Sequence, residues 1–135
     1  MAVAVCPRSN RRHGHGSPTL GLFLGADLRI GLGTDPAASV DCLDMLAEAQ
    51  AARELAGLSA ADALRLLTLA GAEALGWGGE IGSLEPGKWA DLCVIDLAGS
   101  GGVTDEQLAA AVLNGGADAI RATYVGGRLV FDGHG

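Results

Sequence analysis

Asp35 is the residue whose place in the sequence most favours a catalytic or metal-binding role. It directly follows the apolar, glycine-rich run 29–34, which is typical of a buried strand that ends in a single carboxylate. Such a carboxylate can hold a divalent cation or accept a proton from a cation-bound water. The alternative is an aspartate that caps the turn into Pro36, because Asp is common in turns. The local sequence leaves both interpretations open.

A second group of polar residues follows the strand-like run 2–5. Arg8, Ser9 and Asn10 lie in what we predict to be a loop, directly after this run. Their side chains are suited to orienting a substrate by hydrogen bonds. Ordinary capping of the loop explains them equally well, so they are candidates for substrate binding and no more.

Two histidines and a serine are weaker candidates for the same site. His13 and His15 have the spacing of a zinc-chelating pair, but the glycines around them favour a loop. Contact with substrate or solvent is therefore the better interpretation of the pair. Ser39 lies close to Asp35 in the sequence, although a serine ahead of a helix needs no role in a site.

Two predicted strands, 2–5 and 28–33, would position these groups. The residues between them, with a short helix opening at Pro18, suffice for the crossover that parallel strands need. Polar groups at the same ends of parallel strands indicate the carboxyl-terminal rim of an α/β barrel. A complete barrel needs roughly 250 residues, and the chain has 135. We therefore predict the last sector of a barrel and a following domain.

Two helices are predicted after Asp35, over 41–55 and 59–76. Ser59 can cap the second helix and Gly76 can end it. We expect both helices to pack around the outside of a barrel. Their apolar faces are predicted to consist of Leu43, Leu46, Ala47 and Ala51 in the first helix, and of Ala63, Leu64, Leu67 and Ala74 in the second.

After residue 76 the sequence signals change from those of helices to those of turns and strands. We predict that 1–76 are the C-terminal part of a barrel, with its last two strands and following helices, and that 77–135 are part of a composite β-sandwich domain. Turn and strand signals support a small β-rich module. Its predicted elements are a type II turn at 85–88, a strand at 91–96, a helix from Thr104 to Leu113 and a hairpin that turns at Gly126-Gly127.

Composition narrows the choice of compartment and partners. The net charge of −7 disfavours nucleic acid, because phosphates would be repelled. Cys6, Cys42 and Cys93 include no Cys-x-x-Cys pair, so neither a disulfide framework nor a thiolate zinc site is indicated. No apolar run approaches the roughly 20 residues of a membrane-spanning helix. We expect the cytoplasm, with no nucleic-acid or membrane partner.

Four motifs are similar to those of one known family. They are 6–10 after the first strand, 31–35 with its aspartate, 81–92 with its Glu-Pro-Gly-Lys turn, and the hairpin 125–130. Together they resemble the C-terminal portion of the metal-dependent amidohydrolase superfamily, in its chlorohydrolase and aminohydrolase branch. The resemblance covers nearly the whole chain. It implies an α/β fold, in which the C-terminal sector of a (β/α)8 TIM-like barrel precedes a small β-rich sandwich module.

The resemblance also implies an activity. The implied protein is a metal-dependent hydrolase of carbon–nitrogen bonds other than peptide bonds. Its implied reaction is the deamination of a purine-like or related heterocycle. The loop 8–16 most resembles the loop of adenosine-type and aminofutalosine deaminases. Asp35 would bind the metal, which is zinc with iron or manganese as alternatives, and act as general base. A full-length parent would be a homo-oligomer. The candidate substrate-binding residues, taken from their positions in the sequence, are Arg8, Ser9, Asn10, His13, His15 and Ser39.

The chain departs from the family in one large respect. The family's His-x-His strand, its two later histidines and its catalytic glutamate have no counterpart in this sequence. One carboxylate is too few for a catalytic zinc, which normally has three protein ligands. We therefore expect a C-terminal fragment that is inactive by itself. The alternative hypothesis is a noncatalytic remnant or binding module whose β-rich tail associates with a partner chain.

Overall fold

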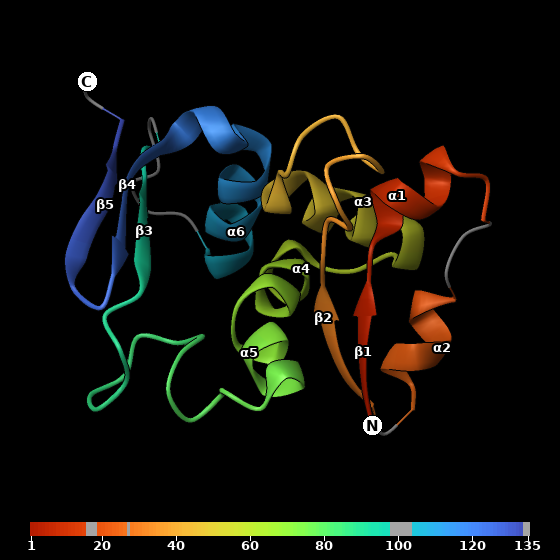
Figure 1. Ribbon diagram of the computed structural model, residues 1–135, viewed down its shortest axis with the longest axis horizontal. Helices are drawn as coiled ribbons and strands as arrows, with labels where there is room; N and C mark the ends of the chain where they lie inside the picture. Colours follow the sequence, from red (N-terminus) through yellow and green to blue (C-terminus); the bar gives the residue numbers. More distant parts are fainter. Residues whose placement is uncertain (16–18, 27, 98–103, 134–135) are drawn as a thin grey trace.

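Two small β-sheets lie on opposite sides of a group of helices in the computed structural model (Figure 1). The structure describes residues 1–15, 19–26, 28–97 and 104–133. Within these ranges, no helix has the length and apolar character needed to cross a membrane. In chain order the elements are β1 (Ala2–Val5), α1 (Pro7–Arg12), α2 (Leu20–Leu24), β2 (Arg29–Leu32), α3 (Met45–Ala56), α4 (Ala60–Leu67), α5 (Leu69–Leu75), β3 (Leu92–Ile95), α6 (Asp105–Gly115), the 3-10 helix η1 (Ala117–Ala119), β4 (Ile120–Val125) and β5 (Arg128–Asp132).

The first sheet is the predicted parallel pair. β1 and β2 pair in parallel from Ala2 with Arg29 to Val5 with Leu32, and α2 lies in the crossover between them. Pro18, predicted to open that helix, lies outside the described residues. The described part of the chain is a mixed α/β structure without a closed barrel, because its parallel sheet has two strands. The core beside this sheet is formed by Val5, Leu20, Ile30, Ala52, Leu66 and Ala70.

The segment after β1 is a helix, and the prediction of a loop there was wrong. Pro7 occupies the first turn of α1, where its fixed φ and missing N–H are tolerated. The backbone N–H of Asn10 donates to the carbonyl of Cys6 at 3.0 Å. The polar residues at this position are therefore held on a helix, and their side chains have fixed directions relative to the strands.

The first predicted helix begins later than expected and buries a different face. Asp44 caps α3, since its side chain accepts a hydrogen bond from the backbone N–H of Ala47 at 3.0 Å. Leu43 therefore precedes the helix, and it is 63% exposed. The residues of α3 that are buried are Glu48, Ala49, Ala51 and Ala52. Of the predicted apolar face, Ala51 is buried and Leu46 is partly buried against the core, while Leu43 was wrong.

The second predicted helix is divided in two at Thr68. Its predicted ends are confirmed, because Ser59 caps α4 and Gly76 ends α5 with a φ of 83°. The division allows α5 to lie against β2 at very close range. A Cβ atom at Gly31 would lie 3.0 Å from the Cα of Gly71, so this contact favours glycine at position 31. Periodicity alone does not reveal such a break.

The second sheet is antiparallel, in the order β3-β4-β5. The hairpin between β4 and β5 turns at Gly126 and Gly127, whose φ values are 57° and 76°, as predicted. Thr104 and Gln107 form the predicted capping box at the start of α6. The predicted turn is also present, since the N–H of Lys88 donates to the carbonyl of Glu85 at 3.2 Å.

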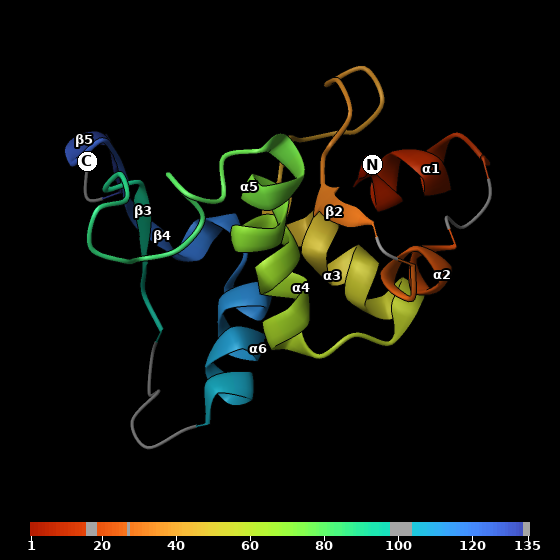
Figure 2. The same cartoon turned by 90° about the horizontal axis from the view of Figure 1, so that it is seen from below.

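Helix α6 packs on the other helices and does not stay with the second sheet. Leu113, which is 1% exposed, joins the alanines of α3, α4 and α6 in one core cluster. Figure 2 shows α6 beside α4, between the two sheets. The domain boundary after residue 76 stays a prediction, but the packing of the chain crosses it. The alanines are Ala49, Ala60, Ala63 and Ala109.

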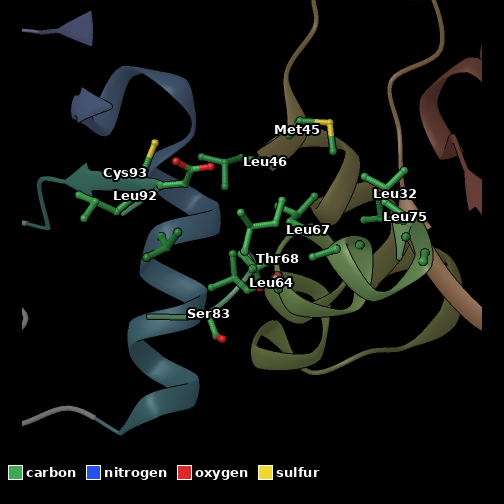
Figure 3. A pocket seen from close by; sticks show the side chains of 18 of the residues that line it. Leu32, Met45, Leu46, Leu64, Leu67, Thr68, Leu75, Ser83, Leu92 and Cys93 are labelled. Atoms are coloured by element: carbon green, nitrogen blue, oxygen red, sulfur yellow. Dashed lines mark hydrogen bonds between the residues drawn. The ribbon is translucent and has the colours of Figure 1, made fainter. Parts of the chain in front are cut away.

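A large apolar cavity lies between the helices and the second sheet. Its volume is about 1010 Å³, and its lining comes from both halves of the chain. Leucine side chains dominate the view in Figure 3, in which Leu64 and Leu67 of α4 lie on one side of the opening and Leu92 of β3 on the other. The predicted stripe residues Leu64 and Leu67 are partly buried: they pack against the alanine-rich core cluster and also line this space. The second sheet faces the helices across this loosely filled region, whereas α6 joins them in the core.

Candidate functional site

Asp35 lies just beyond β2, at the same end of the sheet as α1. It has a φ of 65° and is the non-glycine residue with a positive φ in the described part of the chain. Aspartate tolerates this left-handed conformation better than most residues. The Asp35 side chain is exposed, and the hydroxyl of Ser9 donates a hydrogen bond to its Oδ2 at 2.7 Å. The turn therefore directs the carboxylate towards α1.

Ser9 links α1 to Asp35 from a buried position. It is 2% exposed, and α1 fixes its direction. A hydroxyl that donates to a carboxylate leaves the carboxylate's other lone pairs as acceptors. Ser9 thereby orients Asp35 without using up its capacity to bind a cation or a proton.

A cavity of about 520 Å³ extends along β1 to Asp35. Asn10 also lines it, so an amide and a carboxylate face the same space. Two of the predicted site residues, Asn10 and Asp35, thus share a cavity, and a third, Ser9, is bonded to one of them. The remaining wall is formed by Val3, Ala4, Val5, Cys6, Thr19 and Phe23.

Cys6 is a neutral thiol at the edge of this site. Burial raises the pKa of its thiol, and the negative charges of Asp35 and Glu48 raise it further, while backbone hydrogen bonds at Asp35 and Gly33 oppose the shift. A thiol with a raised pKa is a poor nucleophile at neutral pH. Cys6 therefore contributes volume and shape to the cavity.

Arg8 turns away from this cavity. Its guanidinium donates to the carbonyl of Cys42 at 3.3 Å and lies 3.8 Å from Oε1 of Glu48. Its backbone N–H donates to Oε2 of Glu48 at 3.0 Å. Arg8 thus joins α1 to α3 and to the segment before it. The substrate-binding role predicted for Arg8 stays a prediction, and the contacts of its side chain are with the protein.

The other three candidates do not line the cavity at Asp35 in the described structure. His13 ends α1, and the rings of His13 and His15 stack with centroids 5.7 Å apart on the exposed surface. Ser39 lies in a turn, where its N–H donates to the carbonyl of Pro36 at 2.8 Å. The substrate contacts of all three residues stay predictions.

The described residues do not make a complete metal site. Among them, no group of three or more His, Cys, Asp or Glu side chains is arranged to hold a metal ion. Asp35 has the right chemistry for one ligand, because it is an exposed carboxylate whose position is fixed by Ser9. A catalytic zinc needs about three protein ligands. The site fits a cation only if other residues complete its coordination.

Glu48 is the residue of this region that the sequence interpretation missed. It is fully buried, at 0% exposure, although it carries a carboxylate. Burial raises the pKa of this carboxyl, while the N–H and the charge of Arg8 oppose the shift. A signal was present, because Glu48, Ala52 and Leu55 have the spacing of one helical face. An acid within an apolar stripe is unusual unless it is paired.

Comparison with known proteins identifies the family. The sequence profile described as the Amidohydrolase family matches residues 2–130. The chain belongs to the amidohydrolase family. A 5-methylthioadenosine/S-adenosylhomocysteine deaminase from Teredinibacter turnerae is 41% identical over 103 residues, which are 70% of this chain and 23% of that protein. The resemblance noted in the sequence motifs is thereby confirmed.

Solved structures of this family have the same fold over nearly the whole chain. Guanine deaminase from E. coli is 31% identical and superposes with a TM-score of 0.87, over 97% of this chain and 34% of its own. An adenosine deaminase from Xanthomonas campestris with bound zinc is 34% identical, with a TM-score of 0.84, over 95% of this chain and 31% of its own. The chain spans about a quarter to a third of the length of these relatives.

Proposed function

We propose that this chain is the C-terminal part of a metal-dependent deaminase that acts on a purine-like or related aminated heterocycle. The observation that carries the proposal is the Ser9–Asp35 hydrogen bond of 2.7 Å beside a cavity, at the end of the parallel strands, in a member of the amidohydrolase family. The relatives named above are deaminases of adenosine derivatives and of guanine. On this proposal, residues 1–76 complete a barrel and 77–135 belong to a β-sandwich domain.

Each residue of the site has a distinct task in this proposal. Asp35 is one ligand of a divalent cation and accepts the proton of the attacking water. Ser9 holds Oδ2 of Asp35, so that the carboxylate keeps one orientation. Asn10 offers amide hydrogen bonds to a heterocycle in the cavity that it shares with Asp35. A bound cation supplies acidity, because it lowers the pKa of its water to about 7.

The metal is proposed to be zinc, because one of the related structures contains it. The other ligands would come from the part of the family's length that this chain does not span. The 135-residue chain alone is therefore expected to bind no stoichiometric zinc and to release no ammonia from aminated purines. Tight binding of one zinc per chain would contradict the proposal that most ligands lie elsewhere.

A second candidate function is a noncatalytic chain that associates with a partner through its second sheet. The observation that favours it is the set of exposed apolar side chains on this half of the chain, with Trp89 59% and Phe131 49% exposed. Apolar surface of this kind is typical of a contact face. A stable complex of the 135-residue chain that forms without zinc, together with an inactive full-length protein, would favour this second candidate.

The decisive experiment is an activity assay of the full-length protein that contains this chain. Ammonia release is measured with adenosine, 5-methylthioadenosine and guanine for the wild type, Asp35→Asn and Asp41→Asn. Loss of the base and ligand predicts a decrease in kcat/KM of about 10²–10⁴-fold for Asp35→Asn. Asp41 is an exposed aspartate paired with Arg12, so Asp41→Asn should keep wild-type activity. Equal activity of the two variants would overturn the role of Asp35.

A further inference from the structure

We propose that Glu48 is a positioning residue for Asp35, which it controls through α1 and Ser9. Glu48 touches neither Asp35 nor the cavity beside it in the described contacts. It binds the first turn of α1, and the next residue of that helix binds Asp35. The role as a positioning residue rests on the function proposed for Asp35.

The contact between Glu48 and α1 is made at the backbone. Oε2 of Glu48 accepts the N–H of Arg8 at 3.0 Å, an N–H that has no partner within the helix because it lies in the first turn. The guanidinium of Arg8 lies 3.8 Å from Oε1 of the same carboxylate. Glu48 therefore binds both the main chain and the side chain of Arg8. This double contact fixes the position and the rotation of α1.

The burial of Glu48 indicates a specific purpose. Its side chain is 0% exposed, and in the described structure Oε1 is the buried side-chain oxygen or nitrogen that lacks a hydrogen bond. An incompletely paired buried carboxylate destabilises the folded state, so an alanine or leucine on the same face would be less destabilising. The other buried residues of α3 are alanines, which fill this helix face without such a cost. The acid is needed for the contact with α1.

The connection from Glu48 to Asp35 is short and rigid. Arg8 and Ser9 are neighbours on α1, and Ser9 donates to Oδ2 of Asp35 at 2.7 Å. α1 has six residues, so it has few contacts of its own with which to hold its place. A rotation of this short helix moves the Ser9 hydroxyl off Asp35. The carboxylate, which is exposed, would then be free to turn.

The test follows two signals in the isotope-labelled 135-residue chain at pH 7 without metal: amide hydrogen exchange at Arg8 and the carboxyl carbon resonance of Asp35. Ser9→Ala defines the resonance of an Asp35 carboxylate that has lost its donor. Glu48→Ala should accelerate exchange at Arg8 about 10- to 100-fold and move the Asp35 resonance in the direction set by Ser9→Ala. In the Ser9→Ala background, Glu48→Ala should leave the Asp35 resonance unchanged.

Two further variants control the result. Glu54→Ala removes an exposed carboxylate of the same helix, one that pairs with Arg11 of α1 at 3.5 Å, and should change neither signal. Glu48→Gln keeps an acceptor for the Arg8 N–H, so it should give smaller changes of the same sign. If Glu48→Ala does not fold, Glu48→Gln carries the test by this partial change.

Two outcomes overturn the proposal. Faster exchange at Arg8 with the Asp35 resonance at its wild-type position would show that Glu48 anchors α1 and does not position Asp35. An unchanged rate of amide exchange at Arg8 in both Glu48 variants would overturn it as well. Because neither signal needs metal or substrate, this failure would leave the proposed deaminase activity untouched. An inactive full-length protein would, in turn, leave the measured link between Glu48 and Asp35 intact.

Discussion

Replacement of Leu113 by alanine should be among the most damaging changes in the second half of the chain. Leu113 is 1% exposed, and each buried carbon that is lost is worth about 0.8 kcal/mol, so the lost burial alone is about 2 kcal/mol. The buried residues around it are alanines of α3, α4 and α6, whose short side chains cannot reach into the space. The space left by the removed side chain therefore stays empty, and the total loss of unfolding free energy should be about 3–5 kcal/mol.

The assay is equilibrium unfolding in urea, followed by helical circular dichroism. Leu22→Ala is the matched control, because Leu22 lies on a helix and is 73% exposed; its effect should stay below about 0.5 kcal/mol. A loss at Leu113 within 1 kcal/mol of that control would refute the reasoning. It would mean that α6 is not docked on α3 and α4 and that residues 77–135 fold as a separate module.

Three more predictions concern the packing and two acids, the buried Glu48 and the exposed Glu106. Gly82→Ala should destabilise the chain more than Gly57→Ala in the same urea assay, since both have positive φ but only the Cβ at Gly82 would lie 2.7 Å from another Cβ, that of Ala72; equal losses would contradict this packing. Burial raises the pKa of Glu48, so the stability that this group contributes is present below its ordinary pKa and is lost as pH rises through its pKa in the folded state. Glu48→Gln should therefore gain stability relative to wild type on going from pH 4 to pH 8. A difference in unfolding free energy that does not change with pH would refute the raised pKa. The N–H groups of Ala60 and Ala61 hold the pKa of Glu106 below its usual range, so this contribution is present above the ordinary pKa and is lost as pH falls through the folded value; Glu106→Gln should be less stable than wild type at pH 6, and the gap should close in acid unfolding titrations.

Elements with strong local signals were predicted correctly from the sequence. The hairpin at Gly126-Gly127, the capping box at Thr104 and the cap at Ser59 each depend on two or three neighbouring residues. Backbone conformation and caps of this kind are decided locally. They therefore formed as expected.

Predictions that depended on distant contacts were less reliable. α1 was taken for a loop, since the residue that accepts the free N–H of Arg8 lies forty positions away, at Glu48. The helix breaks at Thr68, and beyond the break α5 approaches β2 closely where Gly31 meets Gly71, a contact that no local pattern records. The sequence predicted Asp35 as a candidate from its strand end, but its link to Ser9 required the fold.

The amount of zinc in the full-length protein tests the central claim most directly. Zinc per chain is measured after dialysis for the wild type, Asp35→Asn and the exposed control Asp41→Asn. The account predicts about one tightly bound zinc in the wild type and in Asp41→Asn, and loss of most of it in Asp35→Asn, because a ligand is removed. Zinc that stays at wild-type content in Asp35→Asn would contradict the account.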